Sequence, residues 1–173
     1  MENPSAYRFP DSRIAQRGDK VFPMSDASFP PLTVLAEDEQ ILRQSVRDFA
    51  NAEIRPLSRE MDEHAKMSAA LLEKLFGLGL MGVEIPEAHG GAGGTFFHSV
   101  LVVEELSRVD PSVGVLVDVQ NTLVINAIMR WGSDALKARL LPRLASKSVG
   151  AYGLSEAGSG SDAFALQTRA VAS

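Results

Sequence analysis

The sequence predicts a mainly α-helical fold, in which an antiparallel helical domain leads into the first strands of a β-structure. Apolar residues recur at helical spacing between residues 37 and 144, and glycine and proline divide this stretch into separate segments. After residue 148 the spacing changes to the alternation of a short strand. We therefore expect a flexible N-terminal arm over residues 1–32, a helical domain over 33–147, and the start of a β-domain over 148–173.

Composition and charge exclude several classes of function. The 173 residues are 45% hydrophobic and 23% charged, as in ordinary globular proteins. The net charge of -5, without any run of Lys or Arg, argues against nucleic-acid and anionic-membrane partners. The chain has no cysteine, which excludes disulfides, thiolate catalysis and cysteine-based zinc sites. His64, His89 and His98 are too scattered to suggest a metal site.

The sequence carries only weak targeting signals. The apolar stretch from Val113 to Met129 is interrupted by polar residues, including Asp118 and Gln120, so we expect no membrane-spanning segment. Arginines and serines occur near the N-terminus, but the acidic residues among them argue against an organellar transit peptide.

A first amphipathic helix is predicted to begin at Glu37. Residues 1–32 before it are rich in proline, serine and charge and show no sustained period, which is typical of a loose arm. From Glu37 onward apolar residues follow i, i+3, i+4 spacing, and acidic residues occupy the first turn, where the helix dipole favours negative charge. Pro56 is expected to end or kink this helix.

A polar link through Asp62 and Glu63 is predicted to precede a second helix. Ser68 is the N-cap candidate for its apolar residues, and Gly77 ends it. The next fifteen residues, 80–94, contain five glycines and a proline. No Lys-Ser or Lys-Thr follows these glycines, so we interpret the segment as a conformational connector and not as a phosphate cradle.

Three further helices are predicted. One runs from Phe96 to Ser107, and a second begins at Pro111, where a missing N–H is harmless, and continues to Arg130. The 111–130 helix is apolar on nearly every side, which indicates a central position. Its apolar residues can be pure core, or its N-terminal half can wall an apolar ligand cavity. A last helix over residues 135–144 is capped by Ser133, which brings the total to about five antiparallel helices.

The densest chemistry lies near the C-terminus, from Ala151 to Asp162. Val149 to Leu154 alternates like a half-buried strand and delivers a loop of serines and glycines. Glycines there let backbone N–H groups face a bound group, although a plain surface turn closed by Asp162 has the same pattern. Residues 164–172 read as a second strand. Two strands do not form an independent sheet, so a partner or further sequence is needed to complete it.

Several segments resemble the acyl-CoA dehydrogenase family, in family order and from about Leu32 onward. Gly153 to Asp162 is similar to the flavin-binding signature of that family, in which a strand ending in Leu-Ser-Glu is followed by a small-residue turn and Gly-Ser-Asp. Residues 80–91 resemble its glycine-rich connection, Glu104 to Ser107 its next helix, and Gly132 with Pro142 the following one. Residues 118–123 and 153–166 look most like the short/branched-chain group, which oxidises 2-methyl-branched acyl-CoAs.

The resemblance implies an FAD-dependent enzyme that dehydrogenates the α,β bond of an acyl-CoA thioester and is reoxidised by an electron-transferring flavoprotein. Leu154 would lie against the flavin ring, Ser155 would hydrogen-bond its polar edge, and Ser161 would also touch the acyl-CoA. The implied FAD-lining residues are Tyr152, Gly153, Leu154, Ser155, Glu156, Ala157, Gly158, Ser159, Gly160 and Ser161. The implied acyl-cavity wall consists of Gly114, Val115, Asp118 and Val119.

The sequence also departs from the family pattern. The catalytic Glu and the C-terminal helical bundle that forms the family's homotetramer have no counterpart here, so we expect the isolated chain to be inactive. Glu156 is structural in the family and is given no base function, and Ala36 replaces a usual capping Thr. The open alternative is a non-catalytic helical module that binds a partner or acyl-CoA. A family member would reside in the mitochondrial matrix of a eukaryote or in the cytoplasm of a bacterium.

Overall fold

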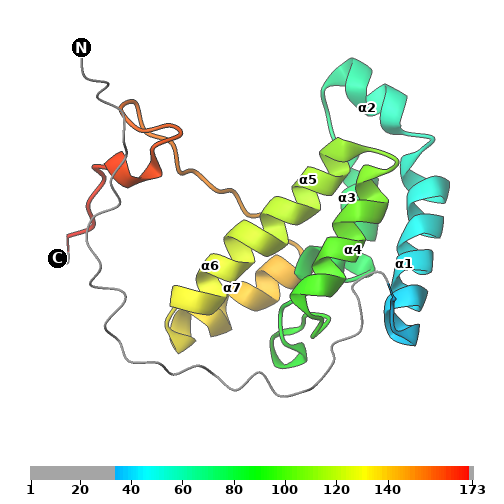
Figure 1. Cartoon of the computed structure of the whole chain (residues 1–173), viewed down its shortest axis with the longest axis horizontal. Helices are drawn as coiled ribbons and strands as arrows, with labels where there is room; N and C mark the ends of the chain where they lie inside the picture. The colour runs from blue at the N-terminus through cyan, green and yellow to red at the C-terminus, as the bar shows by residue number, and fades with distance from the viewer. Residues whose placement is uncertain (1–33, 172–173) are drawn as a thin grey trace, which may run out of the picture. The chain divides into compact units, whose positions relative to one another are not determined.

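A computed structural model describes residues 34–171, and within them the chain is mainly helical (Figure 1). The predicted N-terminal arm, residues 1–32, lies outside the described part. The helices, in chain order, are α1 (Glu37–Phe49), α2 (Ser58–His64), α3 (Ala69–Gly77), α4 (Phe96–Ser107), α5 (Pro111–Asp118), α6 (Asn126–Trp131) and α7 (Asp134–Ser146). Two π-helical turns, η1 (Ala50–Ile54) and η4 (Val119–Ile125), extend α1 and join α5 to α6. The predicted mainly α-helical fold is confirmed.

Helix α1 starts without a side-chain cap, as expected from Ala36 in the cap position. Half of the usual reciprocal arrangement is present, because the Ala36 N–H donates to Glu39 Oε2 at 2.8 Å. The predicted caps of the other helices are formed: the hydroxyl oxygens of Ser68 and Ser133 accept from the N–H groups of Leu71 and Leu136 at 3.4 and 3.3 Å.

The polar link predicted between the first two long helices is wrong, because the chain forms α2 there. Met61 is the buried residue of this short helix, so its sequence shows no helical period. A hydrogen-bonded ion pair between Arg59 and Glu63, one turn apart, adds local support at 2.8 Å. Ala65 ends the helix in the left-handed conformation, with φ of 47°.

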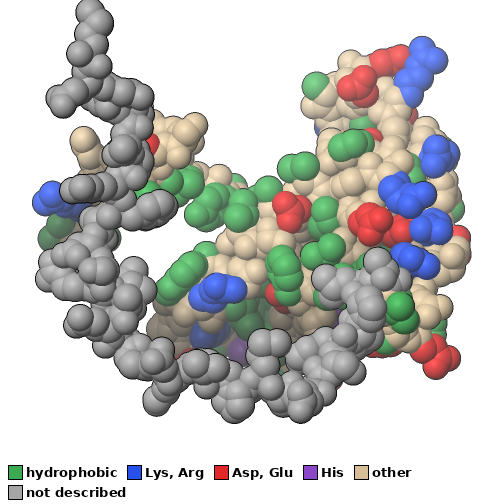
Figure 2. Space-filling model, viewed as in Figure 1, with side chains coloured by type: hydrophobic (Ala, Val, Ile, Leu, Met, Phe, Trp, Pro, Cys, Tyr) green, Lys and Arg blue, Asp and Glu red, His purple; other side chains and the backbone are tan. Residues whose placement is uncertain are grey.

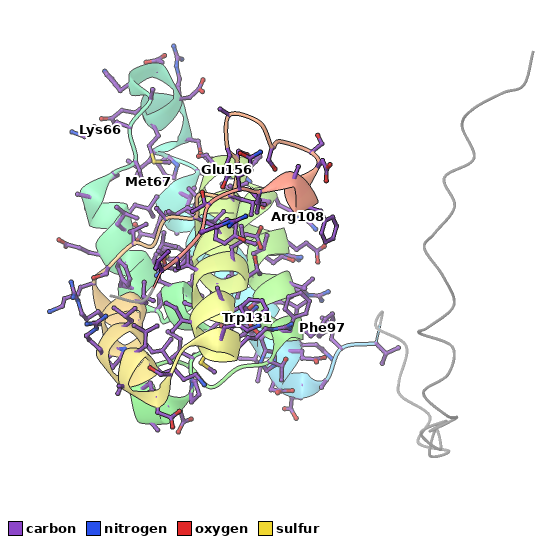
Figure 3. All side chains as sticks on the ribbon, turned by 90° about the vertical axis from the view of Figure 1, so that its left-hand side faces the viewer. Lys66, Met67, Phe97, Arg108, Trp131 and Glu156 are labelled. Carbon is purple, nitrogen blue, oxygen red and sulfur yellow. The ribbon has the colours of Figure 1, made fainter. Side chains whose placement is uncertain are left out.

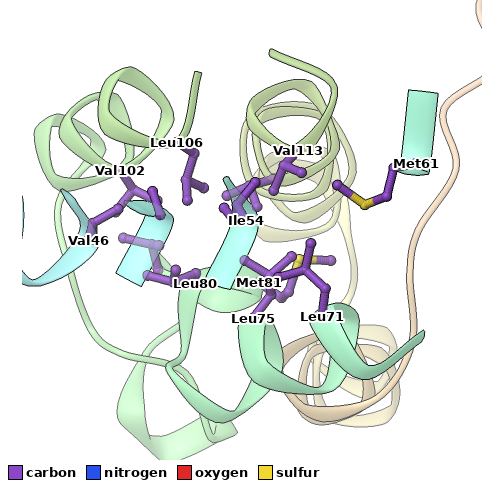
Figure 4. Close-up of a cluster of buried hydrophobic side chains, with 13 residues drawn as sticks. Val46, Ile54, Met61, Leu71, Leu75, Leu80, Met81, Val102, Leu106 and Val113 are labelled. Atoms are coloured by element: carbon purple, nitrogen blue, oxygen red, sulfur yellow. The ribbon is translucent and has the colours of Figure 1, made fainter. Parts of the chain in front are cut away.

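The main hydrophobic core lies between α1, α3, α4 and α5 (Figure 4). The side chains labelled in that view come from these helices, from α2 and from the connection before α4: Val46, Ile54, Met61, Leu71, Leu75, Leu80, Met81, Val102, Leu106 and Val113. A second buried cluster, centred on Ile125 and Leu141, joins the end of η4 to α7. The α5–η4–α6 helix contributes to both clusters, which confirms its central position.

An ion pair ties α1 to α4 beside the core. Arg47 Nε and Nη2 donate to the two carboxylate oxygens of Glu105 at 2.8 and 2.6 Å, and only 1% of the Glu105 side chain is exposed. The hydrogen bonds from Arg47 hold the pKa of Glu105 below its usual range, against the effect of burial. Glu105 is therefore a buried anion that depends on its arginine partner.

The glycines between α3 and α4 are required by the backbone path. Gly79, Gly90 and Gly93 have positive φ values of 73°, 81° and 65°. A Cβ on Gly91 would lie 2.1 Å from the carbonyl oxygen of Ile85. These constraints support the interpretation of this segment as a conformational connector.

The continuous helix Pro111–Trp131 is long and apolar enough to cross a membrane by length and composition, with a mean hydropathy of 1.4. The polar residues that interrupt it therefore do not exclude a span by length and composition, and the expectation of no membrane-spanning segment stays a prediction. The same helix packs against α4 and carries buried amide side chains that hydrogen-bond to distant parts of the chain. Within the described residues it acts as the core helix of the domain.

The two strands predicted after α7 are absent from the described residues. Backbone pairing in this segment is limited to an isolated bridge between Glu156 and Ser159. The alternating pattern of residues 149–154 is real, but the described part of the chain offers no neighbouring strand to pair with it. The segment therefore leaves α7 as extended, unpaired backbone (Figure 1).

Candidate functional site

The residues predicted to wall an acyl cavity divide between two sides of α5. Val115 is exposed, and Asp118 and Val119 are half-buried, at the i, i+3, i+4 spacing that places them on one helix face. Thr122 continues this face, since its hydroxyl lies 2.9 Å from both Asp118 O and Asp118 Oδ1. Gly114 is buried on another side, where a Cβ would lie 2.0 Å from Ser107 Oγ of α4.

Two buried amides in η4 organise the middle of the long helix. Asn121 Nδ2 donates to Leu80 O and Val117 O at 2.9 Å, and its Oδ1 accepts from the Val83 N–H at 2.9 Å. The side chain of the preceding residue, Gln120, also makes three hydrogen bonds, to the end of α7 and the residues just after it. Sequence reasoning missed both roles, although two consecutive amides inside an apolar helix were a visible signal.

The predicted flavin loop begins beside this helix. Tyr152 lines a groove of about 310 Å³ together with residues of η4 and α6, including Thr122 and Leu123. Trp131, at the end of α6, contributes to the same groove and is 79% exposed (Figure 3). Exposed apolar side chains gather over the long helix and the extended segment (Figure 2). The structure thus brings the start of the loop to the helix that carries the predicted cavity wall.

Internal hydrogen bonds shape the loop itself. Glu156 and Ser159 exchange backbone hydrogen bonds of 2.9 and 3.1 Å, which closes a tight turn over Ala157 and Gly158. Ser159 is 3% exposed, and its hydroxyl donates to Asp162 O at 2.6 Å. The Ser159 hydroxyl proton is therefore donated to a group of the loop itself.

The Glu156 carboxylate, labelled in Figure 3, binds the backbone of residues 167 and 168. It accepts from the N–H groups of Gln167 and Thr168 at 2.8 and 3.0 Å. Hydrogen bonds from the Thr168 side chain and from these two N–H groups lower the pKa of Glu156. This arrangement stabilises the ionised form and gives Glu156 a shaping role.

The outer side of the loop is open to a ligand. A Cβ added to Gly153, Gly158 or Gly160 would meet no atom within 4 Å. Leu154, Ser155 and Ser161 are exposed, as is Tyr152. The loop therefore presents hydroxyls, accessible backbone and apolar side chains on one exposed segment.

Other features of the described residues do not contribute to this site. No group of three His, Asp or Glu residues within 34–171 is placed to hold a metal ion. A larger cavity, of about 800 Å³, lies between α2 and the turn into α5, where Lys66 and Met67 are among its lining residues. It contains none of the predicted site residues.

Comparison with known proteins assigns the chain to a family. Residues 36–148 match the family model described as "Acyl-CoA dehydrogenase, N-terminal domain". The chain belongs to the acyl-CoA dehydrogenase family. The chain is 46% identical over 158 residues to the probable short/branched chain specific acyl-CoA dehydrogenase of Dictyostelium discoideum, covering 91% of the chain and 38% of the relative.

Two further relatives extend the comparison. The short/branched chain specific acyl-CoA dehydrogenase, mitochondrial, of Bos taurus is 43% identical over 140 residues, covering 81% of the chain and 32% of that protein. The crystal structure of a glutaryl-CoA dehydrogenase from Mycobacterium smegmatis in complex with FADH2 aligns with a TM-score of 0.72 and 30% identity, covering 78% of the chain and 35% of that structure. The chain thus spans about a third of the length of these relatives.

Proposed function

We propose that this chain is the N-terminal part of an FAD-dependent acyl-CoA dehydrogenase that acts on short or branched-chain acyl-CoA. The reaction removes a proton from the α-carbon and a hydride from the β-carbon of the thioester, which leaves a double bond between them. When bound, FAD supplies the acceptor for that hydride.

One observation carries the proposal beyond family membership. The start of the flavin loop and the exposed face of the long helix lie side by side, because Tyr152 and Thr122 line the same groove and Thr122 bonds to Asp118. A flavin held by the loop would therefore have an apolar helix face beside it. A dehydrogenase needs this proximity, since hydride transfer requires the β-carbon and the flavin to be in contact.

The loop residues divide into holding and shaping roles in this proposal. Ser155 would hydrogen-bond the polar edge of the flavin, Leu154 would contact its ring, and Ser161 would reach both FAD and acyl-CoA. Tyr152, Gly153, Ala157, Gly158 and Gly160 would line the cofactor. Glu156 and Ser159 would keep the loop in shape, because their side chains bond within the segment.

On the helix, Val115, Asp118 and Val119 would form the wall that the acyl chain contacts. Side-chain volume at these positions would set which chain lengths and branches fit. Gly114 would support this wall without lining the cavity, since its buried side approaches Ser107 and lets α4 and α5 pack closely.

The proton would be taken by a glutamate that, by family resemblance, belongs to a C-terminal helical bundle. We propose no residue of 34–171 for that role. Residues 1–173 expressed alone should therefore show no turnover and bind FAD weakly or not at all. By the same resemblance, the holoenzyme, meaning the flavin-loaded product of the complete reading frame containing this chain, would be a homotetramer reoxidised by an electron-transferring flavoprotein. It would reside in the mitochondrial matrix or the bacterial cytoplasm.

The experiment compares the purified 1–173 chain with the holoenzyme. We expect the holoenzyme to carry flavin absorbance and to reduce an electron acceptor with 2-methyl-branched or short acyl-CoA. We expect the 1–173 chain to do neither after gel filtration. A holoenzyme without flavin would contradict the proposal and would favour a non-catalytic module that binds acyl-CoA or a partner. Turnover by the 1–173 chain would contradict the proposal that the catalytic base lies outside these residues.

A further inference from the structure

The side chain of Gln120 is a buried junction between the long helix and the segment that leads to the flavin loop. It is 0% exposed, and both its amide nitrogen and its amide oxygen are hydrogen-bonded. Gln120 Nε2 donates to Leu144 O at 2.9 Å and to Ser148 O at 3.0 Å. Gln120 Oε1 accepts from the Gly150 N–H at 2.7 Å. One side chain therefore holds the last turn of α7 and the first residues beyond it.

Gly150 is held at the same place by packing. A Cβ on Gly150 would lie 2.5 Å from Cγ1 and 3.0 Å from Cγ2 of Val124, one turn after Gln120. The backbone of the segment thus approaches the helix more closely than any residue with a side chain permits. Two independent contacts, one polar and one steric, fix Gly150 against η4.

These contacts matter because the described residues contain no strand pairing that would set the register of the segment. An extended chain advances about 3.3 Å per residue and turns alternate side chains to opposite sides. A slip of one residue at Gly150 would therefore turn Tyr152 and Leu154 to the other side and displace the loop.

We propose that Gln120 is a positioning residue that sets the register of the flavin loop relative to the acyl-cavity wall. The wall residues lie on the same helix within the six residues before Gln120, so the Gln120–Gly150 contact couples the two halves of the site through one rigid element. This inference rests on the proposed function.

Asn121 provides a matched control, since its buried side chain also makes three hydrogen bonds, but two of them hold the connection before α4. Gln120→Met and Asn121→Leu each remove three side-chain hydrogen bonds at similar volume from adjacent positions. In the purified chain, Gln120→Met should speed exchange of the Gly150 amide about tenfold or more, while Asn121→Leu should do so for Val83.

The decisive measurement is FAD affinity of the holoenzyme. Gln120→Met should weaken FAD binding about tenfold or more and change the flavin absorbance spectrum. Asn121→Leu should lower the melting temperature to a similar extent and leave the flavin spectrum unchanged. Equal losses of FAD in both variants, or no loss in Gln120→Met, would overturn the inference. A native holoenzyme without flavin would instead overturn the proposed function, and the two failures are thus distinguishable.

A milder variant covers the case in which Gln120→Met does not fold. Gly150→Ala pushes the segment away from Val124 without touching the helix core. It should weaken FAD binding, and adding Val124→Ala should restore part of the affinity by making room for the new methyl group. If Gly150→Ala binds FAD as the native holoenzyme does, the register of the loop does not depend on this junction and the inference is wrong.

Discussion

Replacing Gly114 by alanine tests whether this glycine sets the close packing of α4 on α5. The new Cβ would lie 2.0 Å from Ser107 Oγ, 3.1 Å from Ser107 Cβ and 3.2 Å from Ser107 Cα. A different Ser107 rotamer relieves the first contact only, so the two helices must separate. Such overpacking costs about 1–3 kcal/mol, and the helix gains about 0.5–1 kcal/mol when glycine becomes alanine. We expect a net loss of about 1–2 kcal/mol, or a fall of about 2–8 °C in melting temperature.

Gly77 supplies the matched control. It is the last residue of α3, it is exposed, and an added Cβ would meet no atom within 4 Å. Gly77→Ala should stabilise the chain by about 0.4–1 kcal/mol, because it restricts the unfolded state. The two glycine-to-alanine changes should therefore shift the melting temperature in opposite directions in thermal unfolding followed by circular dichroism.

The origin of the Gly114 effect is tested by a double-mutant cycle with Ser107→Gly. Removing Ser107 Cβ together with Oγ should recover part of the loss, with a coupling energy on the order of 1 kcal/mol. Additive effects of the two changes, or stabilisation by Gly114→Ala alone, would refute the argument that this glycine sets the spacing of α4 and α5.

Four other changes test the remaining structure. Ala36→Thr should add the missing cap of α1 and raise stability by about 1 kcal/mol in denaturant unfolding, and no gain would show that the Glu39 bond already suffices. The pKa of Glu105 is depressed in the folded state, so the stability that its carboxylate contributes is present above the ordinary carboxyl pKa and is lost as the pH falls through the folded value. Glu105→Gln should therefore flatten the acid side of the plot of melting temperature against pH. An unchanged slope would contradict this. Gly91→Ala should destabilise strongly through the Ile85 carbonyl, whereas Gly153→Ala, with open space around it, should leave the melting temperature unchanged.

Local sequence patterns were sufficient to predict most of the helices. The ranges for α4 and the helix from Pro111 follow from apolar spacing and from a proline at the first turn, and both depend only on neighbouring residues. Ser68 and Ser133 were identified as caps because a cap bonds to an N–H three residues away. The short helix α2 was missed for the converse reason, since a single buried residue gives no period.

The strands were wrongly predicted because alternation is a local property and pairing is not. The pattern of residues 149–154 is that of a strand, yet a strand forms only beside another one. The resemblance of the same segment to a flavin signature rests on contiguous residues, and the cofactor role that it implies stays a prediction. What the motif does as a site still depends on the segment's position against the helix.

Sequence alone thus determined the helical class, the order of the helices, the glycine-rich connector and the family, since each is encoded within short windows of the chain. Tertiary structure decided the partners of the buried polar groups. Gln120 and Asn121 bond to residues between 24 and 41 positions away in the chain, apart from Asn121's bond to Val117 one turn before it. Glu105 meets Arg47 across 58 positions. No local pattern specifies such pairs, because they form only when the packed helices bring distant groups together and remove them from water.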